Sequence, residues 1–138
     1  MKEILDLLAG QGRVELDRAA LLLATIEYPN LNIDGFLSLL DSHASELHRR
    51  LDGVEGLAFV HEANRYLFEE LGFRGNTDDY YNPANSCLND VLTARLGIPI
   101  TLSVVYIEIA RRLGRPVFGV GLPGHFVVRY DDGREAVY

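Results

Sequence analysis

The chain is poor in cysteine, in basic residues and in long apolar segments, and each shortage excludes a class of protein. Its 138 residues include one cysteine, so no internal disulfide can form and the chain suits a reducing compartment. Asp and Glu outnumber Lys and Arg by 20 to 13, which gives a net charge of −7, and the largest basic clusters are the pairs Arg49-Arg50 and Arg111-Arg112. No nucleic-acid partner is therefore expected, because phosphate binding needs a basic face.

Long apolar segments are also missing. The longest uncharged apolar stretch, Gly97 to Ile107, is too short to cross a bilayer and contains Pro99. The opening residues, Met1 to Asp6, lack the apolar stretch of a signal peptide. We therefore expect a cytoplasmic protein that does not bind membranes.

The remaining composition is that of one folded domain. Hydrophobic residues make up 48% of the chain and charged residues 24%, as in ordinary soluble proteins, and this length is enough to bury a core. No internal repeat or low-complexity segment is present. We expect a single domain over residues 1-138, with a helical part (1-72), a loop (73-84), and core helices and a sheet (85-138).

The helical part shows apolar residues spaced three and four apart. Asn32 or Asp34 can cap the longest of these helices, and Gly72 has the position of a glycine that ends the last one. The predicted helices cover Met1–Ala9, about Leu16 to just before Pro29, Ile33–Leu51, and about Val54–Leu71.

The second half of the chain has a different sequence pattern from the helical part. Residues 74–82 are polar, aromatic and aperiodic, which indicates a surface loop, and Asn85 or Ser86 can cap a short helix that runs to Arg95. The helix predicted over Thr101–Leu113 is apolar nearly all round and should be the buried central helix. Strands are predicted over 115–121, 124–130 and 134–138, with a hairpin turn at Asp131-Asp132-Gly133. Helices followed by an antiparallel sheet predict an α+β domain.

Four segments of this chain resemble the transglutaminase-like superfamily, in its second branch of SirB-type bacterial proteins, which join such a domain to tetratricopeptide repeats. The segments are Asn85-Ser86-x-Leu88-Asn89-x-Val91-Leu92, Gly97-Ile98-Pro99-Ile100-x-Leu102, Arg112-Leu113-Gly114, and Gly121-x-Pro123-Gly124-His125-Phe126. The resemblance implies a papain/transglutaminase-like fold, in which amino-terminal helices and a central helix pack on a small antiparallel sheet. It also implies that the family's fold continues past Tyr138, so that this domain is truncated at its carboxyl end.

The resemblance also implies where catalytic residues would stand. In catalytic members a Cys opens the central helix, a His starts a following strand, and an Asp on the next strand orients the His. His125 matches the His, but the position of the Cys falls at Pro99 to Thr101, whereas Cys87 lies one helix earlier. The resemblance places the Asp just beyond Tyr138, and Asp131 and Asp132 lie in the turn, on the wrong side of the last strand.

Each candidate residue has a functional and a structural interpretation. Cys87 could be a thiol activated by a helix amino terminus, or a small buried apolar residue. His125 could be a general base, or it could hold the Pro-Gly turn through a hydrogen bond from its ring. The hydroxyl of Thr101 or Ser103 could replace the thiol, although a helix cap is the expected job of Thr101.

No metal site or cofactor is expected. His43 and His48 stand five residues apart and do not share one helix face, and Asp78-Asp79 lacks the ligand spacing of a calcium loop. Gly119-Val120-Gly121 is too short for a nucleotide-binding loop. Glu108 lies four residues before Arg112, which predicts a structural ion pair.

Two functions follow. The first is a non-catalytic or weakly catalytic transglutaminase-like domain that binds a protein partner through His125, the Gly97–Thr101 bend and the Tyr80-Tyr81 loop. The alternative is a cysteine-dependent amide-bond hydrolase or acyl transferase that uses Cys87 and His125. We predict that the Cys87 sulfur does not reach the ring of His125, and that the carboxyl-terminal sheet edge either self-associates or is covered by the amino-terminal helices.

Overall fold

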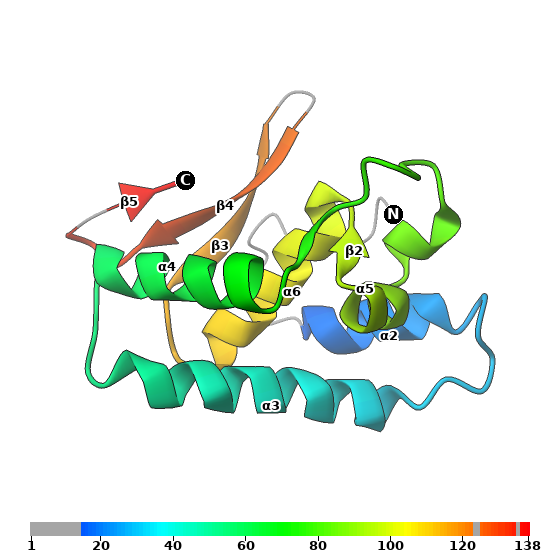
Figure 1. Ribbon diagram of the computed structural model, residues 1–138, viewed down its shortest axis with the longest axis horizontal. Coiled ribbons are helices and arrows are strands. Elements are labelled where there is room, and N and C mark those ends of the chain that lie inside the picture. The colour runs from blue at the N-terminus through cyan, green and yellow to red at the C-terminus, as the bar shows by residue number, and fades with distance from the viewer. Residues whose placement is uncertain (1–14, 123–124, 135) are drawn as a thin grey trace.

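The computed structural model describes residues 15–122, 125–134 and 136–138, without the side chains at 121, 122, 125 and 126. The helix predicted over Met1–Ala9 lies outside the described residues. One helix, α6 (Pro99–Arg112), runs through the centre of the molecule (Figure 1). It contacts α2 (Leu16–Ala24) and α3 (Ile33–Leu51) as well as the strands β3 (Val117–Leu122) and β4 (His125–Asp131).

Helix α6 is the most buried of the described helices, as its sequence predicts. Every residue from Ser103 to Ala110 is buried. The helix begins two residues before the predicted start, with Pro99 in its first turn. Proline is suited to this place because its fixed φ is helical and the N–H that it lacks would have no partner there.

An ionic network with Glu108 and Asp17 buried at its centre joins α6 to α2 and α3. The Arg112 guanidinium donates to Glu108 Oε1 at 3.2 Å, to Asp17 Oδ2 at 2.5 Å and to Asp41 Oδ1 at 2.6 Å. The predicted ion pair of Glu108 and Arg112 is thus present, and Arg111 adds a second donor to Glu108 at 2.8 Å. Burial raises the pKa of Glu108. Burial also acts to raise the pKa of Asp17, but the hydrogen bonds from Arg112 and the Arg18 N–H outweigh it and the pKa is lowered.

The amino-terminal helices follow the predicted pattern with two differences. Asn32 caps α3, since its side chain accepts from the Gly35 N–H at 3.1 Å. Helix α2 ends at Ala24, earlier than the approach to Pro29. The helix expected over Val54–Leu71 divides into α4 (Leu57–Asn64) and a π-helical segment, η1 (Arg65–Glu70).

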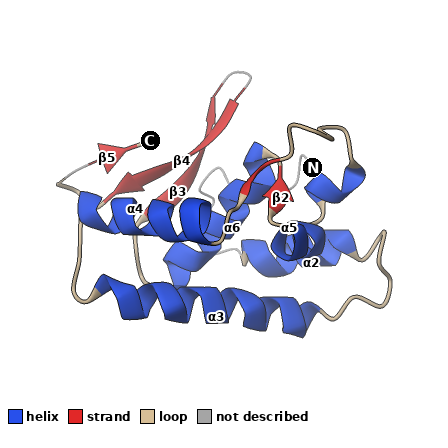
Figure 2. Cartoon of the chain, in the orientation of Figure 1, coloured by secondary structure: helices blue, strands red, loops and turns tan. Residues whose placement is uncertain are grey.

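The sheet is antiparallel, in the order β3-β4-β5, and α6 packs on it (Figure 2). The last strand, β5 (Ala136–Val137), pairs with the end of β4, so that Tyr130 faces Val137. Between them Gly133 takes φ +87°, and its N–H donates to Asp131 Oδ1 at 2.9 Å, which confirms the predicted turn. The α+β architecture is confirmed.

Residues 74–97 depart from the prediction. Part of the expected loop is a short strand, β1 (Arg74–Gly75), which pairs in parallel with β2 (Leu96–Gly97). The expected helix cap is also wrong, because a 3-10 turn, η2 (Pro83–Ser86), precedes α5 (Leu88–Ala94) and neither Asn85 nor Ser86 caps α5. Cys87 occupies the N-cap position instead and makes no side-chain capping bond.

No helix in the described ranges is both long enough and apolar enough to cross a membrane.

Candidate functional site

Cys87 lies between η2 and α5, one helix before α6. Its side chain is 9% exposed, on the wall of a surface hollow of about 300 Å³ between the end of α2 and the start of α5. Burial raises the pKa of the Cys87 thiol, and the carboxylates of Asp90 and Glu27 add to the rise. A raised pKa is the opposite of what an activated cysteine needs, because the thiolate is the nucleophile.

The α6 amino terminus, where the resemblance places a nucleophile, carries two hydroxyls that are already engaged. Thr101 Oγ1 accepts from the Ile98 N–H at 3.1 Å and donates to the Asn85 carbonyl at 2.8 Å. Ser103 Oγ donates to the Pro99 carbonyl at 2.6 Å. The capping role expected for Thr101 is confirmed, and both side chains are buried.

His125 opens β4, and its backbone pairs with that of Leu122. The strand start expected for this residue is therefore present. Its side chain lies outside the described part of the structure, so the separation of the Cys87 sulfur from the His125 ring stays a prediction.

Asn85 connects the start of α6 to the loop before η2. This side chain is 3% exposed; its Oδ1 accepts from Asn76 Nδ2 at 2.9 Å. Its Nδ2 donates to the backbone carbonyls of Asp79 at 3.0 Å and Tyr80 at 2.9 Å. Together with the Thr101 bond to its own carbonyl, these contacts fix the loop to the central helix.

The loop held in this way presents two aromatic rings to solvent. Tyr80 is 57% exposed and Tyr81 is 91% exposed, and the two rings meet edge to face with centroids 5.2 Å apart. Asp79 stiffens the same loop, because its Oδ2 accepts from Asn82 Nδ2 at 2.9 Å. An ordered loop with two exposed tyrosines is typical of a binding surface, since Tyr offers a large contact area with little conformational freedom to lose.

The position of Gly97, in the bend before α6, leaves no room for a side chain. A Cβ added at Gly97 would lie 2.8 Å from Thr101 Oγ1 and 3.2 Å from Val91. Strand β2 therefore approaches α5 and α6 too closely for any larger residue.

The histidines considered as metal ligands differ in burial and do not form a shared site. His43 is buried against the rings of Tyr66 and Phe73, whereas His48 is exposed on the same helix. Among the described residues no three His, Cys, Asp or Glu side chains are grouped to hold a metal ion.

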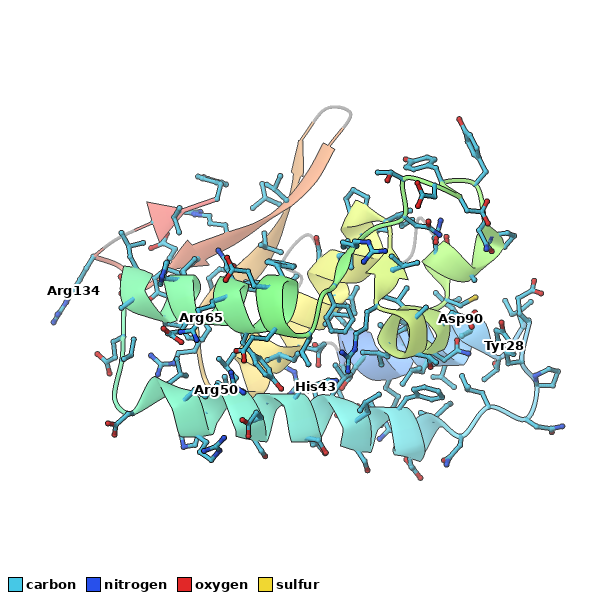
Figure 3. All side chains as sticks on the ribbon, in the orientation of Figure 1. Tyr28, His43, Arg50, Arg65, Asp90 and Arg134 are labelled. Carbon is cyan, nitrogen blue, oxygen red and sulfur yellow. The ribbon has the colours of Figure 1, made fainter. Side chains whose placement is uncertain are left out.

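Sequence reasoning missed the part that α2 plays in this region. We call the hollow beside Cys87 the α2–α5 hollow; it is lined by Leu23, Ala24, Ile26, Glu27, Pro83, Ser86 and Cys87. Near it, Tyr28 and Asp90 join the segment after α2 to α5 (Figure 3), because the tyrosine hydroxyl donates to Asp90 Oδ2 at 2.7 Å. The signal in the sequence was the run Leu21-Leu22-Leu23, which is too apolar for a helix with one solvated side.

Comparison with known proteins gives the family. The family model described as the transglutaminase-like superfamily matches residues 35–138. A UPF0162 protein of Xylella fastidiosa is 48% identical over 117 residues, which are 83% of this chain and 42% of the relative. A UPF0162 protein of Vibrio cholerae is 31% identical over 103 residues, which are 67% of this chain and 38% of that protein.

A eukaryotic protein also matches. F-box only protein 21 of Mus musculus is 46% identical over 72 residues, which are 52% of this chain and 12% of that protein. No solved structure matches the chain. The chain spans less than half the length of these curated relatives. The family model covers most of the chain, including α6 and the sheet, and on this evidence the chain belongs to the transglutaminase-like superfamily.

Proposed function

We propose that this transglutaminase-like domain is non-catalytic or weakly catalytic and works by binding a protein partner. The observation that carries the proposal is the Tyr80-Tyr81 loop, whose exposed rings are held in place by the buried amide of Asn85. When the hydrogen bonds of a buried polar side chain hold an exposed loop in one conformation, that conformation is expected to matter for function. The binding surface includes this loop and the Gly97–Thr101 bend beside it.

The chemistry around α6 supports a binding function over catalysis. The thiol of Cys87 is buried on another helix and has a raised pKa. The hydroxyls of Thr101 and Ser103 donate to backbone carbonyls and are not free to attack a substrate. These observations weigh against the alternative, a cysteine-dependent hydrolase or acyl transferase.

The relatives give a second line of support. The matching region is 42% of the Xylella protein and 12% of mouse F-box only protein 21. A domain found as a small part of longer and differently named proteins suits the role of an interaction module.

A selection experiment tests the binding proposal. A displayed random-peptide library is selected on the intact chain, and the enriched peptides are measured against Tyr81→Ser and against Tyr138→Ser, in which another exposed tyrosine is removed. We expect Tyr81→Ser to weaken binding about tenfold or more, as for an aromatic hot spot, and Tyr138→Ser to leave it unchanged. Failure to enrich any peptide, or equal binding to wild type and Tyr81→Ser, would contradict the proposal.

Alkylation of Cys87 tests the enzyme alternative directly. Because the pKa of this thiol is raised, iodoacetamide at pH 6 should modify the folded chain no faster than the urea-unfolded chain, as followed by intact mass. Faster alkylation in the folded state would indicate an activated thiol and would favour the alternative.

A further inference from the structure

The α2–α5 hollow has apolar walls that the rest of the described chain leaves open. Ile26 is 77% exposed on its rim, and Leu23 and Cys87 form part of its wall. Its volume of about 300 Å³ is large enough for one or two aliphatic side chains. The 3-10 turn η2 links the hollow to the tyrosine loop, because Asn85, which anchors Tyr80, belongs to the same turn as the lining residues Pro83 and Ser86.

The charged residues in the two chain segments that line this hollow are all acidic. Neither segment that lines it contributes a cation, because no Lys or Arg occurs from residue 19 to 48 or from 75 to 94. Carboxylates come from Glu27 in the lining, from Asp90 in the first turn of α5 and from Asp78-Asp79 in the tyrosine loop. The carboxylates of Asp90 and Glu27 add to the rise in the pKa of Cys87 that burial causes.

We propose that the α2–α5 hollow seats an apolar side chain of a basic protein segment, in which Lys or Arg flanks the apolar residue and pairs with Glu27 and Asp90. This inference rests on the proposed function, since it names the partner chemistry of the same surface. The exposed tyrosine rings extend the site, because Tyr faces attract Arg and Lys.

Charge decides between this occupant and the other candidates. A second copy of this chain carries a net charge of −7, so its approach to an acidic rim is unfavourable. A neutral apolar segment would fill the hollow but would gain no electrostatic attraction from Glu27 and Asp90. A basic segment satisfies both the apolar wall and the acidic rim.

The test uses short synthetic peptides with a central Leu, flanked by Arg in one series, by Ser in a second and by Glu in a third. Fluorescence anisotropy gives their dissociation constants for the intact chain. Cys87, as the only cysteine, reports occupancy, because a peptide seated in the hollow shields it from N-ethylmaleimide at pH 8.5. Backbone amide shifts of Leu23 to Glu27 and of Ser86 provide a second readout that does not depend on thiol reactivity.

Two variants and a control localise the binding. Glu27→Gln removes one rim charge and should weaken the Arg peptide about threefold to fivefold, as for one exposed ion pair. Ser86→Arg fills the hollow with a cation and should abolish binding. Glu69→Gln removes an exposed carboxylate on η1 instead and should leave the dissociation constant unchanged.

The expected result is that the Arg series binds most tightly, loses affinity with added salt, and protects Cys87 from alkylation. Equal affinity of the three series, or full alkylation of Cys87 at saturating peptide, would overturn the inference. Protection of Cys87 that depends on protein concentration alone would identify a second copy as the occupant and would also overturn it.

The two proposals can fail separately. Peptides that need Tyr81 but show no preference for Arg and leave Cys87 reactive would refute the basic segment and keep the binding function. Arg peptides that protect Cys87 equally in wild type and Tyr81→Ser would keep the hollow and remove the tyrosine loop from the site.

Discussion

Asn85 in η2 and Asn89 in α5 are four residues apart and both buried, but their amides are used differently. Asn85 has partners for both amide atoms, whereas Asn89 Oδ1 has none among the described residues. Position alone therefore does not decide what a buried asparagine contributes. The contribution of Asn85 comes from the loop carbonyls that it satisfies.

Replacing Asn85 with Ala should lower the free energy of unfolding by about 2–3 kcal/mol, because the donor and the two carbonyls that it contacts lose their partner. Asn89→Ala removes the same volume nearby and is the matched control, with an expected loss below about 1.5 kcal/mol. Urea unfolding measures both. Equal losses would show that the loop contacts of Asn85 do not stabilise the fold.

His43 makes the stability of the fold depend on pH in the mildly acidic range. Burial, with the nearby charge of Arg95, lowers the pKa of this imidazole. Below about pH 6.5 the unfolded chain therefore binds a proton that the folded chain does not, so stability falls as the pH falls toward the lowered pKa. The slope contributed by one such group is at most about 1.4 kcal/mol per pH unit.

His43→Leu should remove this slope between pH 7.5 and 5.5, as measured by urea unfolding at each pH. The substitution should cost at most about 1.5 kcal/mol at pH 7.5, because it removes only the long 3.5 Å contact of Nδ1 with the Tyr66 hydroxyl, Nε2 has no partner among the described residues, and the rings of Tyr66 and Phe73 suit an apolar side chain. The control is His61→Leu, at an exposed position of α4. An unchanged slope in His43→Leu would show that another group causes the acid sensitivity.

At the scale of secondary-structure elements, α6 is the helix on which the hydrophobic core is built. Val105 and Ile109 lie on its buried faces and are 2% and 1% exposed. Replacing either with Ala should lower the free energy of unfolding by roughly 1–4 kcal/mol, through lost apolar burial and a residual cavity. Ile26→Ala, at an exposed position, should cost little, and melting temperatures equal to wild type in the two core variants would contradict the central place of α6.

The elements that sequence reasoning predicted are those whose signal is local. Helix α3 has a three-and-four repeat, an Asn32 cap and no competing pattern, and the structure has these bounds. The β4–β5 turn needs a residue with positive φ, and Gly133 marks it. Such signals lie within a few residues of the structure that they specify.

The elements that it missed depend on partners far along the chain. The parallel pair β1–β2 joins Arg74 to Leu96, and the residues near Arg74 do not indicate that it pairs with a strand so far along the chain. Asn85 was expected as a cap because Asn is a good cap, but its side chain bonds to a loop five and six residues earlier. For the candidate site, sequence indicated Cys87 and the tyrosine loop but not the wall supplied by Leu23 and Ile26, which is a tertiary contact.

At the scale of the whole molecule, the β4 edge is only partly paired. Strand β4 has seven residues, but β5 pairs with Tyr130 and Asp131 alone. The backbone of Val127 to Arg129 therefore has no neighbouring strand on that side within the described residues. An open edge can add a strand from another chain.

We predict weak self-association through this edge, seen as a mass above that of the monomer at high concentration in sedimentation equilibrium. Ala136→Lys places a charge on the edge strand and should reduce it, while Ala58→Lys adds the same charge on α4 as a control. A monomer mass for wild type at every concentration would contradict this prediction.

The contact of Arg112 with Asp17 joins residues 95 apart in the chain. Helices α2 and α3 are made before α6 during synthesis, and α6 is the helix that both of them contact. Until α6 leaves the ribosome, Leu21, Leu40 and Leu47 can pack only against the other early helices and lack the central helix of the core, so the early half of the chain cannot complete a core by itself. Folding must therefore await the second half, and the nascent helices are natural clients for a chaperone during that delay.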